Sequence, residues 1–344
     1  MGARVRGTVQ QEERGVTGQD AGAEEPRRAS GARPRMPVWA ALSAAGVIGA
    51  LTAVQARVNG QLGVRLDDGF VAAVVSFGSG LIILVVLSLV LPSGRRGFAR
   101  LLSGVRERGI PWWMLLGGAA GALTVATQGL VVGIIGVSLF TVGFVGGQTV
   151  FGLFLDRVGF SPGGVVAVTV PRVLGGALAV AAVVLSLFGA GGSAAPVWML
   201  VLPLIAGVGV AWQQATNGRL RQKVGTPLTA TLVNFIGGTV ILAIATAVNI
   251  AFVGAPQPFP PDAWLYAGGA LGVVYIFLAA TIVVHTGVLL LALGTISGQL
   301  LASVVLDALW PAAGSPGILM EIAVVAVALT SVIVAAVPWR RRRR

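Results

Sequence analysis

Glutamine and asparagine side chains recur in this sequence at a spacing that suits binding. Gln55 and Asn59 are four residues apart, and the same pattern returns at Gln213 and Asn217. Residues at i and i+4 share one face of a helix, so each pair presents two amides together. Capping of a helix end and hydrogen bonding between helices would explain the pairs as well as a function does. The functional alternative is gating by two matched polar girdles, which would close an outer and an inner vestibule.

Two further glutamines, Gln148 and Gln299, each follow a glycine within a long apolar segment. An amide buried in lipid is costly unless it finds a partner. These two residues therefore either link neighbouring helices or contribute to a central substrate-binding site, where the preceding glycine would leave space. Other polar or aromatic side chains inside apolar segments could join such a site: Ser76, Gln128, Trp212, Asn234 and His285.

Two carboxylates, Asp156 and Asp307, stand at the ends of apolar segments. A carboxylate at the C-terminal end of a helix is unfavourable to the helix dipole, which predicts a compensating partner such as Arg157. A salt bridge at a gate and a proton relay are the functional alternatives. Arg172 and Glu321 also lie within apolar segments, where an ionisable group is a functional hypothesis by default. Glu321 is close enough to a segment end for its side chain to reach the interface.

Enzyme and cofactor chemistry find little support in the residues. The 344 residues include one histidine and no cysteine, and no HExxH, GxxxxGK or Ser/His/Asp constellation is present. The sequence therefore predicts no catalytic residue, no metal site and no cofactor. The net charge of +12 does not indicate a nucleic-acid partner, because the basic residues lie mostly at the chain ends and in short loops, whereas nucleic-acid binding needs them on one folded face.

Composition places the chain in a lipid bilayer. Hydrophobic residues make up 56% of it and charged residues 10%, and the mean hydropathy is +0.89, whereas soluble domains are about one quarter charged. A helix needs about 20 apolar residues to cross the hydrocarbon core. Ten segments are long enough, or nearly so, and predict an all-α polytopic membrane protein: 37–56, 69–91, 112–132, 136–155, 164–189, 196–216, 227–253, 263–284, 287–306 and 317–338.

The amide pairs also mark an internal repeat. The segment QARVNG at 55–60 returns as QQATNG at 213–218, and the match continues at an offset of 158 and later of 151. The predicted organisation is a disordered basic tail, two five-helix repeats and a short basic tail, at 1–36, 37–190, 191–338 and 339–344 respectively. Because five spans is an odd number, the second repeat must enter the membrane upside down relative to the first. Inverted repeats of this kind are typical of alternating-access transporters.

The basic residues predict the orientation, because cytoplasmic loops keep an excess of Lys and Arg. With the N-terminus in the cytoplasm, 21 of the 24 Lys and Arg residues fall on the cytoplasmic side. The exceptions are Arg57 and Arg65, in the first outer loop, and Arg172, in the fifth span. The sequence therefore predicts a multi-pass protein of the cytoplasmic membrane with both termini in the cytoplasm.

The repeated motifs resemble a known family. The segments QARVNGQL, SFGSG and GGQTVFGLFLDRVG, with QQATNGRL, NFIGG and SGQLLASVVLD in the second half, are similar to the YdcZ type of bacterial membrane protein, in the drug/metabolite transporter (DMT) superfamily. The resemblance covers residues 37–338 and suggests a fused form with both five-span units. It implies two inverted five-helix bundles around a central cavity, with the fifth and tenth helices more peripheral. It also implies export of small metabolites or toxic compounds.

A secondary transporter that works by alternating access is therefore the leading hypothesis. Its partners would be a small-molecule substrate and the lipid bilayer. Coupling to a proton or another ion, uncoupled transport and a homodimer all stay open. The alternative is a non-transporting membrane scaffold or assembly partner, whose centre would be sealed by side chains.

Overall fold

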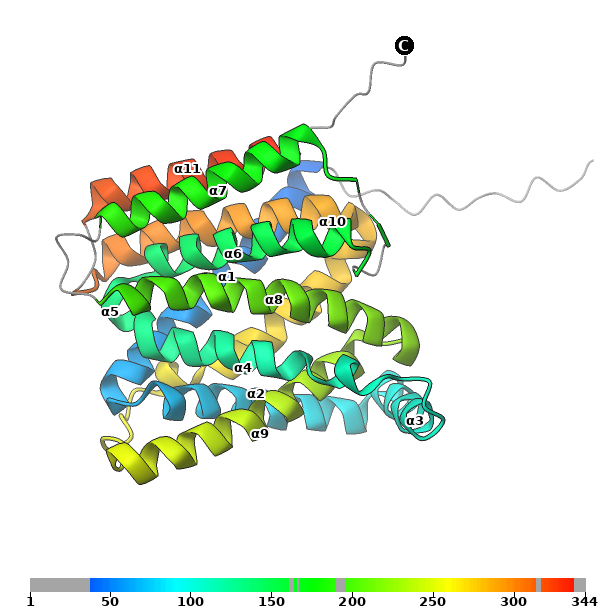
Figure 1. Cartoon of the computed structure of the whole chain (residues 1–344). Coiled ribbons are helices and arrows are strands. Elements are labelled where there is room, and N and C mark those ends of the chain that lie inside the picture. Colours follow the sequence, from blue (N-terminus) through cyan, green and yellow to red (C-terminus); the bar gives the residue numbers. More distant parts are fainter. Residues whose placement is uncertain (1–37, 161–163, 166, 190–195, 314–316, 337–344) are drawn as a thin grey trace, which may run out of the picture. The chain divides into compact units, whose positions relative to one another are not determined.

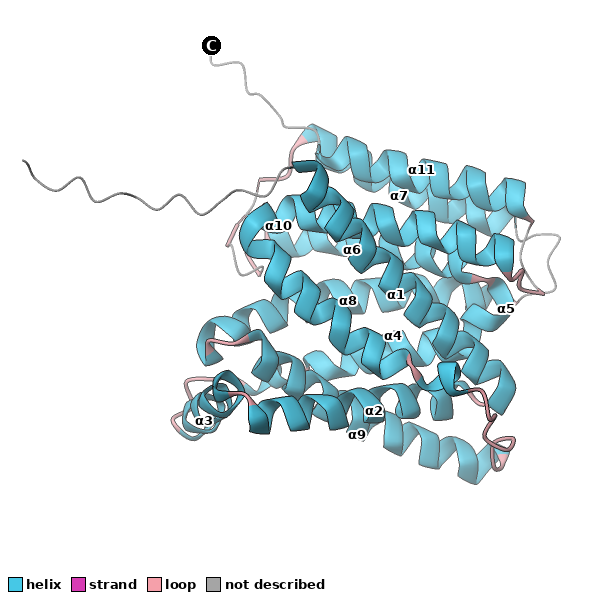
Figure 2. Ribbon diagram, turned by 180° about the vertical axis from the view of Figure 1, so that it is seen from behind, coloured by secondary structure: helices cyan, strands magenta, loops and turns pink. Residues whose placement is uncertain are grey.

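The described part of the chain is helical. The computed structural model describes residues 38–160, 164–165, 167–189, 196–313 and 317–336, and no strand occurs among them (Figure 2). The predicted tails at 1–36 and 339–344 lie outside the described residues. All the helices belong to one compact unit, Met36–Arg344.

Eleven α-helices and three short helical turns follow one another along the described residues (Figure 1). They are α1 (Val38–Leu66), α2 (Gly69–Val90), α3 (Pro92–Arg106), the 3-10 turn η1 (Trp112–Leu115), α4 (Gly117–Thr127), the π-helical turn η2 (Gln128–Val132), α5 (Gly133–Ile135), α6 (Val137–Arg157), α7 (Val170–Gly189), α8 (Val197–Val224), α9 (Pro227–Val253), the 3-10 turn η4 (Ala263–Tyr266), α10 (Gly268–Leu309) and α11 (Ile318–Ala336).

Seven helical stretches of the described residues are long and apolar enough to cross a membrane: 69–90, 112–135, 137–157, 198–224, 227–253, 291–309 and 318–335. They correspond to seven of the ten predicted spans. Two of the other three correspond to shorter apolar helices, Val170–Leu185 and Gly268–Ala279. The first predicted span, 37–56, overlaps α1 from Val38 onward.

Helix α1 is longer than its apolar segment predicts, because it continues from residue 56 to Leu66. Gly60 and Gly63 explain the extension. A Cβ on Gly60 would overlap Val132 and Gly133, and a Cβ on Gly63 would overlap the backbone of Gly129. The two glycines therefore let the last turns of α1 pack closely against η2 and α5.

The predicted breaks within the two halves differ in the structure. Gly136 adopts φ +88, a conformation that suits glycine, and it separates α5 from α6. The corresponding residue of the second half, Gly287, stays inside α10, so the predicted spans 263–284 and 287–306 are not separated by a loop. Figure 1 shows the two arms of α10, yellow and orange, meeting at a bend.

Helices from the two halves of the sequence pack against each other in matching combinations. Helix α1 lies along α10, and its counterpart α8 lies along α4 and α6; α2 contacts α9, and α7 contacts α11. At the contact between α2 and α9, the rings of Phe77 and Phe235 stack with centroids 4.8 Å apart. The same cluster includes the fully buried Leu84 and Leu242 from these two helices.

Candidate functional site

The asparagine of the second amide pair lies at the start of a helix from the first half. A Cβ built on Gly117, the first residue of α4, would lie 2.6 Å from Asn217 Oδ1 and 2.5 Å from Asn234 Oδ1. Neither oxygen has a hydrogen-bond partner among the described residues. Two amide oxygens thus converge where only glycine fits, and such oxygens can accept hydrogen bonds from ammonium, hydroxyl or amide groups.

The first half repeats this arrangement against the second. A Cβ built on Gly268, the first residue of α10, would overlap Asn59 Oδ1 and would lie 2.7 Å from Ser76 Oγ. Ser76 occupies the place that Asn234 takes in the other copy. Each predicted Asn is thus brought together with a second predicted polar residue, and each pair contacts the opposite half.

The glutamines of the two pairs are placed in the same crossed manner. Gln55 Nε2 donates a hydrogen bond to the Gly268 carbonyl oxygen at 2.8 Å, and it lies 2.8 Å from the Cβ position of Gly272. Gln213 Nε2 lies 2.7 Å from the Cβ position of Gly121. Both glycines belong to helices of the opposite half, so each Gln-x3-Asn motif holds two successive turns of a crossing helix.

The two copies differ in how tightly they are enclosed. Gln55 is 5% exposed and Asn59 is fully buried, and Asn59 Nδ2 donates to Gln128 Oε1 at 2.7 Å. Gln213 and Asn217 are only half-buried. The sequence accounts for part of the difference, because the position that corresponds to Gln128 is Ala279, which offers no amide.

The mid-span glutamines also occupy unlike environments. Gln148 on α6 is half-buried and donates from Nε2 to Oε1 of the exposed Gln214 at 3.1 Å. Gln299 on α10 is 4% exposed, and its Nε2 has no hydrogen-bond partner among the described residues. An unpartnered buried amide costs free energy, so Gln299 is the mid-span amide whose retention calls for a reason other than packing.

The glycines before these glutamines serve close helix packing, where the sequence suggested that they leave space. A Cβ on Gly147 would overlap the Leu204 carbonyl of α8, and a Cβ on Gly298 would overlap the Gly46 carbonyl of α1. Small residues allow backbones to approach in this way in membrane helices.

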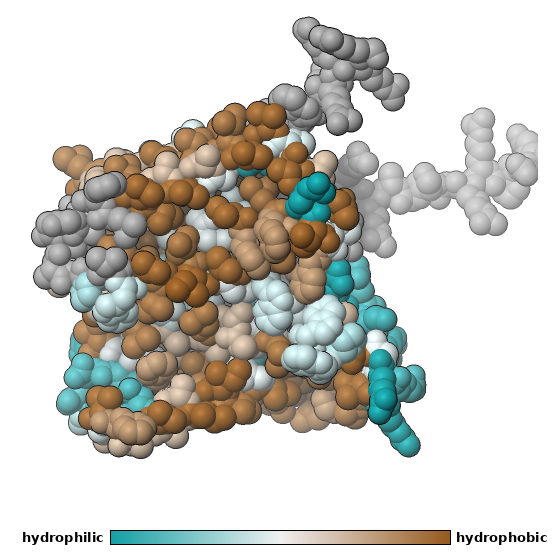
Figure 3. Space-filling view, in the orientation of Figure 1, coloured by the Kyte–Doolittle hydropathy of each residue, from teal (hydrophilic) through white to brown (hydrophobic). Residues whose placement is uncertain are grey.

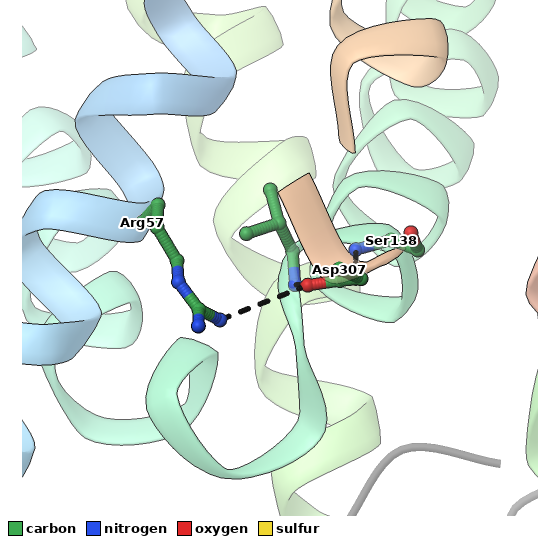
Figure 4. Close-up of polar contacts among 4 residues, drawn as sticks. Arg57, Ser138 and Asp307 are labelled. Atoms are coloured by element: carbon green, nitrogen blue, oxygen red, sulfur yellow. Dashed lines mark hydrogen bonds and ion pairs between the residues drawn. The ribbon is translucent and has the colours of Figure 1, made fainter. Parts of the chain in front are cut away.

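Asp307 caps a helix from the other half. Its carboxylate accepts hydrogen bonds from the backbone N–H groups of Val137 at 2.9 Å and Ser138 at 2.6 Å, at the start of α6. Arg57 Nη1 of α1 lies 3.8 Å from the same carboxylate (Figure 4). Asp307 is 3% exposed. The positive end of the α6 dipole compensates for the position of Asp307 at the end of α10.

Asp156, the counterpart of Asp307, has a different setting. It forms an ion pair with Arg172 of α7, with 3.1 Å between Oδ2 and Nη1, and both side chains are about one quarter exposed. Arg172, unassigned by the sequence beyond its place in the fifth span, is thus a partner of a predicted gate residue. The carboxylate at this end is solvent-accessible, whereas the one at the opposite end is enclosed.

The remaining predicted residues lie apart from these contacts or outside the description. Trp212 is half-buried in a cluster with Leu155, Ala211 and Ala215, near the end of α6. Glu321 is 2% exposed in the first turn of α11. The side chain of His285 lies outside the described residues.

The residues that contact these motifs and Asp307 were not predicted from the sequence. Arg57 was assigned to an outer loop and lies in α1 with 7% exposure. Gly117 and Gly268 are counterparts at the offset of 151, and the stacked Phe77 and Phe235 are counterparts at the offset of 158. The signal that could have found these four residues is the repeat itself, because a glycine or phenylalanine present at matching positions of both halves indicates a contact made twice across the molecule.

The chain matches one protein-family model twice. The model is described as "Putative inner membrane exporter, YdcZ", of the DMT group, and it matches residues 40–185 and again residues 198–335. No curated protein and no solved structure matches the chain. The two matched segments together cover most of the sequence and fall on either side of the gap between α7 and α8.

Proposed function

The chain belongs to the YdcZ family, whose model is described as a "Putative inner membrane exporter", and we propose that it is a secondary transporter that exports small organic metabolites or toxic compounds by alternating access. The observation that carries this proposal is the crossed pair of Gln-x3-Asn contacts. Each motif contacts a helix of the opposite half, and the first copy is more deeply buried than the second. An alternating-access transporter needs two equivalent closures of which only one is tight at a time.

The proposed architecture is ten membrane crossings arranged as two inverted five-helix repeats, 37–190 and 191–338. Two matches to one family model support the repeat. The matching helix contacts also support it: α1 with α10, as α8 with α4 and α6. The distribution of Lys and Arg supports both termini in the cytoplasm.

In this orientation one closure belongs to the outer end of the protein and the other to the inner end. Gln55, Asn59 and Asp307 would form the outer gate, which Arg57 completes by its ion pair. Gln213, Asn217 and Asp156 would form the inner gate, where the side chains are more exposed. The conformation described here is then the one closed toward the outside.

The substrate contacts that we propose are six polar and aromatic residues inside the predicted spans. They are Gln148, Gln299, Asn234, Ser76, Trp212 and Gln128. The unpartnered oxygens of Asn217 and Asn234 and the unpartnered nitrogen of Gln299 support a substrate that carries both hydrogen-bond donors and acceptors. Proton coupling would fall to Asp156 and Asp307.

Reconstitution into liposomes tests the proposal. Proteoliposomes with purified protein are loaded with a panel of labelled amino acids, sugars and organic cations, and efflux is compared with that from protein-free liposomes. The proposal expects efflux of at least one class, slowed by Gln299→Ala. The scaffold alternative would be favoured if no compound of the panel is transported and if reagents reach the outer gate only from outside and the inner gate only from inside.

A further inference from the structure

Helix α3 is an element that the sequence pattern did not predict. It begins at Pro92, directly after the last turn of α2, in a stretch that the basic residues marked only as a loop. Proline suits the first turn of a helix. One face of α3 is packed on the protein: Gly94 lies against the backbone of Ser88, Gly97 lies against Thr226 and Thr229 of the α9 start, and Leu101 is 7% exposed.

A second face of α3 is apolar and uncovered within the described part of the chain. Phe98, Leu102 and Val105 are 40%, 57% and 43% exposed. Their spacing of four and three residues places them in one stripe, beside the packed face. Leu89 and Val90, in the last turn of α2, are each 66% exposed, so the stripe follows directly on the apolar surface of a membrane-crossing helix.

Arginines border this stripe on the side away from the packed face. At about 100° per residue, Arg95 and Arg106 lie next to Leu102 on the helix surface, and both are exposed. The other two arginines of α3 have carbonyl partners: Arg96 Nε donates to the Pro92 oxygen and Arg100 Nη1 to the Val224 oxygen. Arg95 and Arg106 are thus the guanidinium groups beside the apolar stripe.

The direction of α3 fits the plane of a membrane surface. Figure 1 shows α3 nearly along its axis, whereas α2 and the other long helices run across the picture. In Figure 3, hydrophilic residues gather at the same end of the molecule, and the surface between the two ends is largely hydrophobic. Helix α3 therefore lies across the direction of the spans, at an end of the molecule where hydrophilic residues gather.

We propose that α3 is an interfacial helix that binds anionic phospholipids of the adjoining leaflet. Phe98, Leu102 and Val105 would enter the boundary between headgroups and acyl chains, and Arg95 and Arg106 would pair with lipid phosphates. An apolar stripe bordered by arginines is the pattern of helices that lie in the interface plane. Lipid is the fitting occupant because the stripe continues the lipid-facing surface of α2 and because its border is cationic. The proposal does not depend on transport.

The absence of cysteine from the chain makes a direct test simple. Leu102→Cys and the matched Ser103→Cys, which is also exposed and lies about 100° further around α3, outside the apolar stripe, each receive a nitroxide in vesicles of phosphatidylcholine and phosphatidylglycerol. The proposal expects the label at 102 to collide more with oxygen than with a nickel chelate, and the label at 103 to show the reverse. Equal chelate access at both positions would overturn it. Shielding of position 102 from both reagents would instead indicate a protein partner or a second copy.

The arginines are tested through lipid affinity. Phosphatidylglycerol is added to the protein in phosphatidylcholine nanodiscs, and the rise in unfolding temperature gives its affinity. Arg95→Gln with Arg106→Gln should weaken binding about fivefold for each arginine. The control, Arg96→Gln with Arg108→Asn, removes the same charge away from the stripe and should keep most of the affinity. An equal loss in the two double variants would show that only net charge matters and would refute the assignment.

Discussion

Arg57 of α1 lies 3.8 Å from Asp307 at the end of α10, and the same carboxylate caps the start of α6. One side chain thus joins three helices from both halves of the sequence at one end of the molecule. Breaking a buried pair leaves an uncompensated charge and is costly. The corresponding pair at the other end, Asp156 and Arg172, is partly exposed and joins neighbouring helices of one half.

The first prediction concerns this pair as an outer gate. Asp307→Asn removes the charge from both backbone hydrogen bonds and should destabilise the protein by about 2 kcal/mol, in the range of hydrogen bonds to charged groups. It should also open the gate more often. A cysteine placed at Ser138, which is 1% exposed, should then react about tenfold faster with an impermeant maleimide applied from outside, the factor that corresponds to about 1.4 kcal/mol.

An exposed ion pair supplies the control for this experiment. Arg65 lies 3.9 Å from Asp262, with side chains 58% and 41% exposed, and such pairs contribute about 0–1 kcal/mol. Arg65→Gln should therefore change neither stability nor labelling at position 138. Equal labelling in the Asp307→Asn variant and the parent would remove Asp307 from the gate.

The second prediction concerns Gly117 and Gly268, the glycines that the asparagine side chains contact. Gly268→Ala places a methyl group on Asn59 Oδ1, and Gly117→Ala places one between Asn217 and Asn234. Both should lower the unfolding temperature, as overpacking costs about 1–3 kcal/mol. Gly268→Ala should cost more, because Asn59 is fully buried whereas Asn217 is half-buried.

The matched control is Gly78→Ala in α2, where no atom lies within 4 Å of the added Cβ. Alanine favours a helix over glycine by about 1 kcal/mol, so this variant should be as stable as the parent or more so. If Gly117→Ala and Gly268→Ala behave like Gly78→Ala, the crossed contacts are looser than the structure indicates.

The third prediction separates a structural from a functional role for Gln299. Its Nε2 lacks a hydrogen-bond partner among the described residues, so Gln299→Leu should leave stability unchanged or raise it, because a buried amide is replaced by an apolar group of similar size. Efflux from proteoliposomes should nevertheless fall. A parallel loss of stability and efflux would mean that the amide links helices and does not contact substrate.

The sequence predicts the membrane class and the family correctly, because they depend on composition and on repeated motifs. It predicts which residues are paired across the repeat, such as Asn59 with Asn217. It does not predict that each contacts the first residue of a helix in the opposite half, because packing between halves is a tertiary property without a local signal. Helix α3 is not predicted for another reason: its four arginines indicate a cytoplasmic loop, and its apolar stripe has only three residues, Phe98, Leu102 and Val105.

The unequal burial of the two Gln-x3-Asn motifs has a similar explanation. Gln128 of the first half accepts a hydrogen bond from Asn59, whereas the corresponding residue of the second half is Ala279, which has no amide. This difference can be read from the sequence alone. Its consequence for burial depends on the contact between Asn59 and Gln128, which are 69 residues apart in the sequence. Repeats predict equivalent positions, and departures from the repeat indicate where the two copies of a contact differ.

The fourth prediction concerns the stacked rings of Phe77 and Phe235, the counterparts in α2 and α9. Their centroids are 4.8 Å apart and the side chains are 5% and 7% exposed. Phe77→Ala and Phe235→Ala should each destabilise the protein by about 3–5 kcal/mol. The double variant should lose about 0.5–1.5 kcal/mol less than the sum, the coupling expected of an aromatic pair. Phe252→Ala in α9 removes a ring that is 86% exposed and should be nearly neutral. A double-mutant cycle by reversible unfolding in detergent measures these terms, and additive losses would show that the two rings do not form a shared contact between the halves.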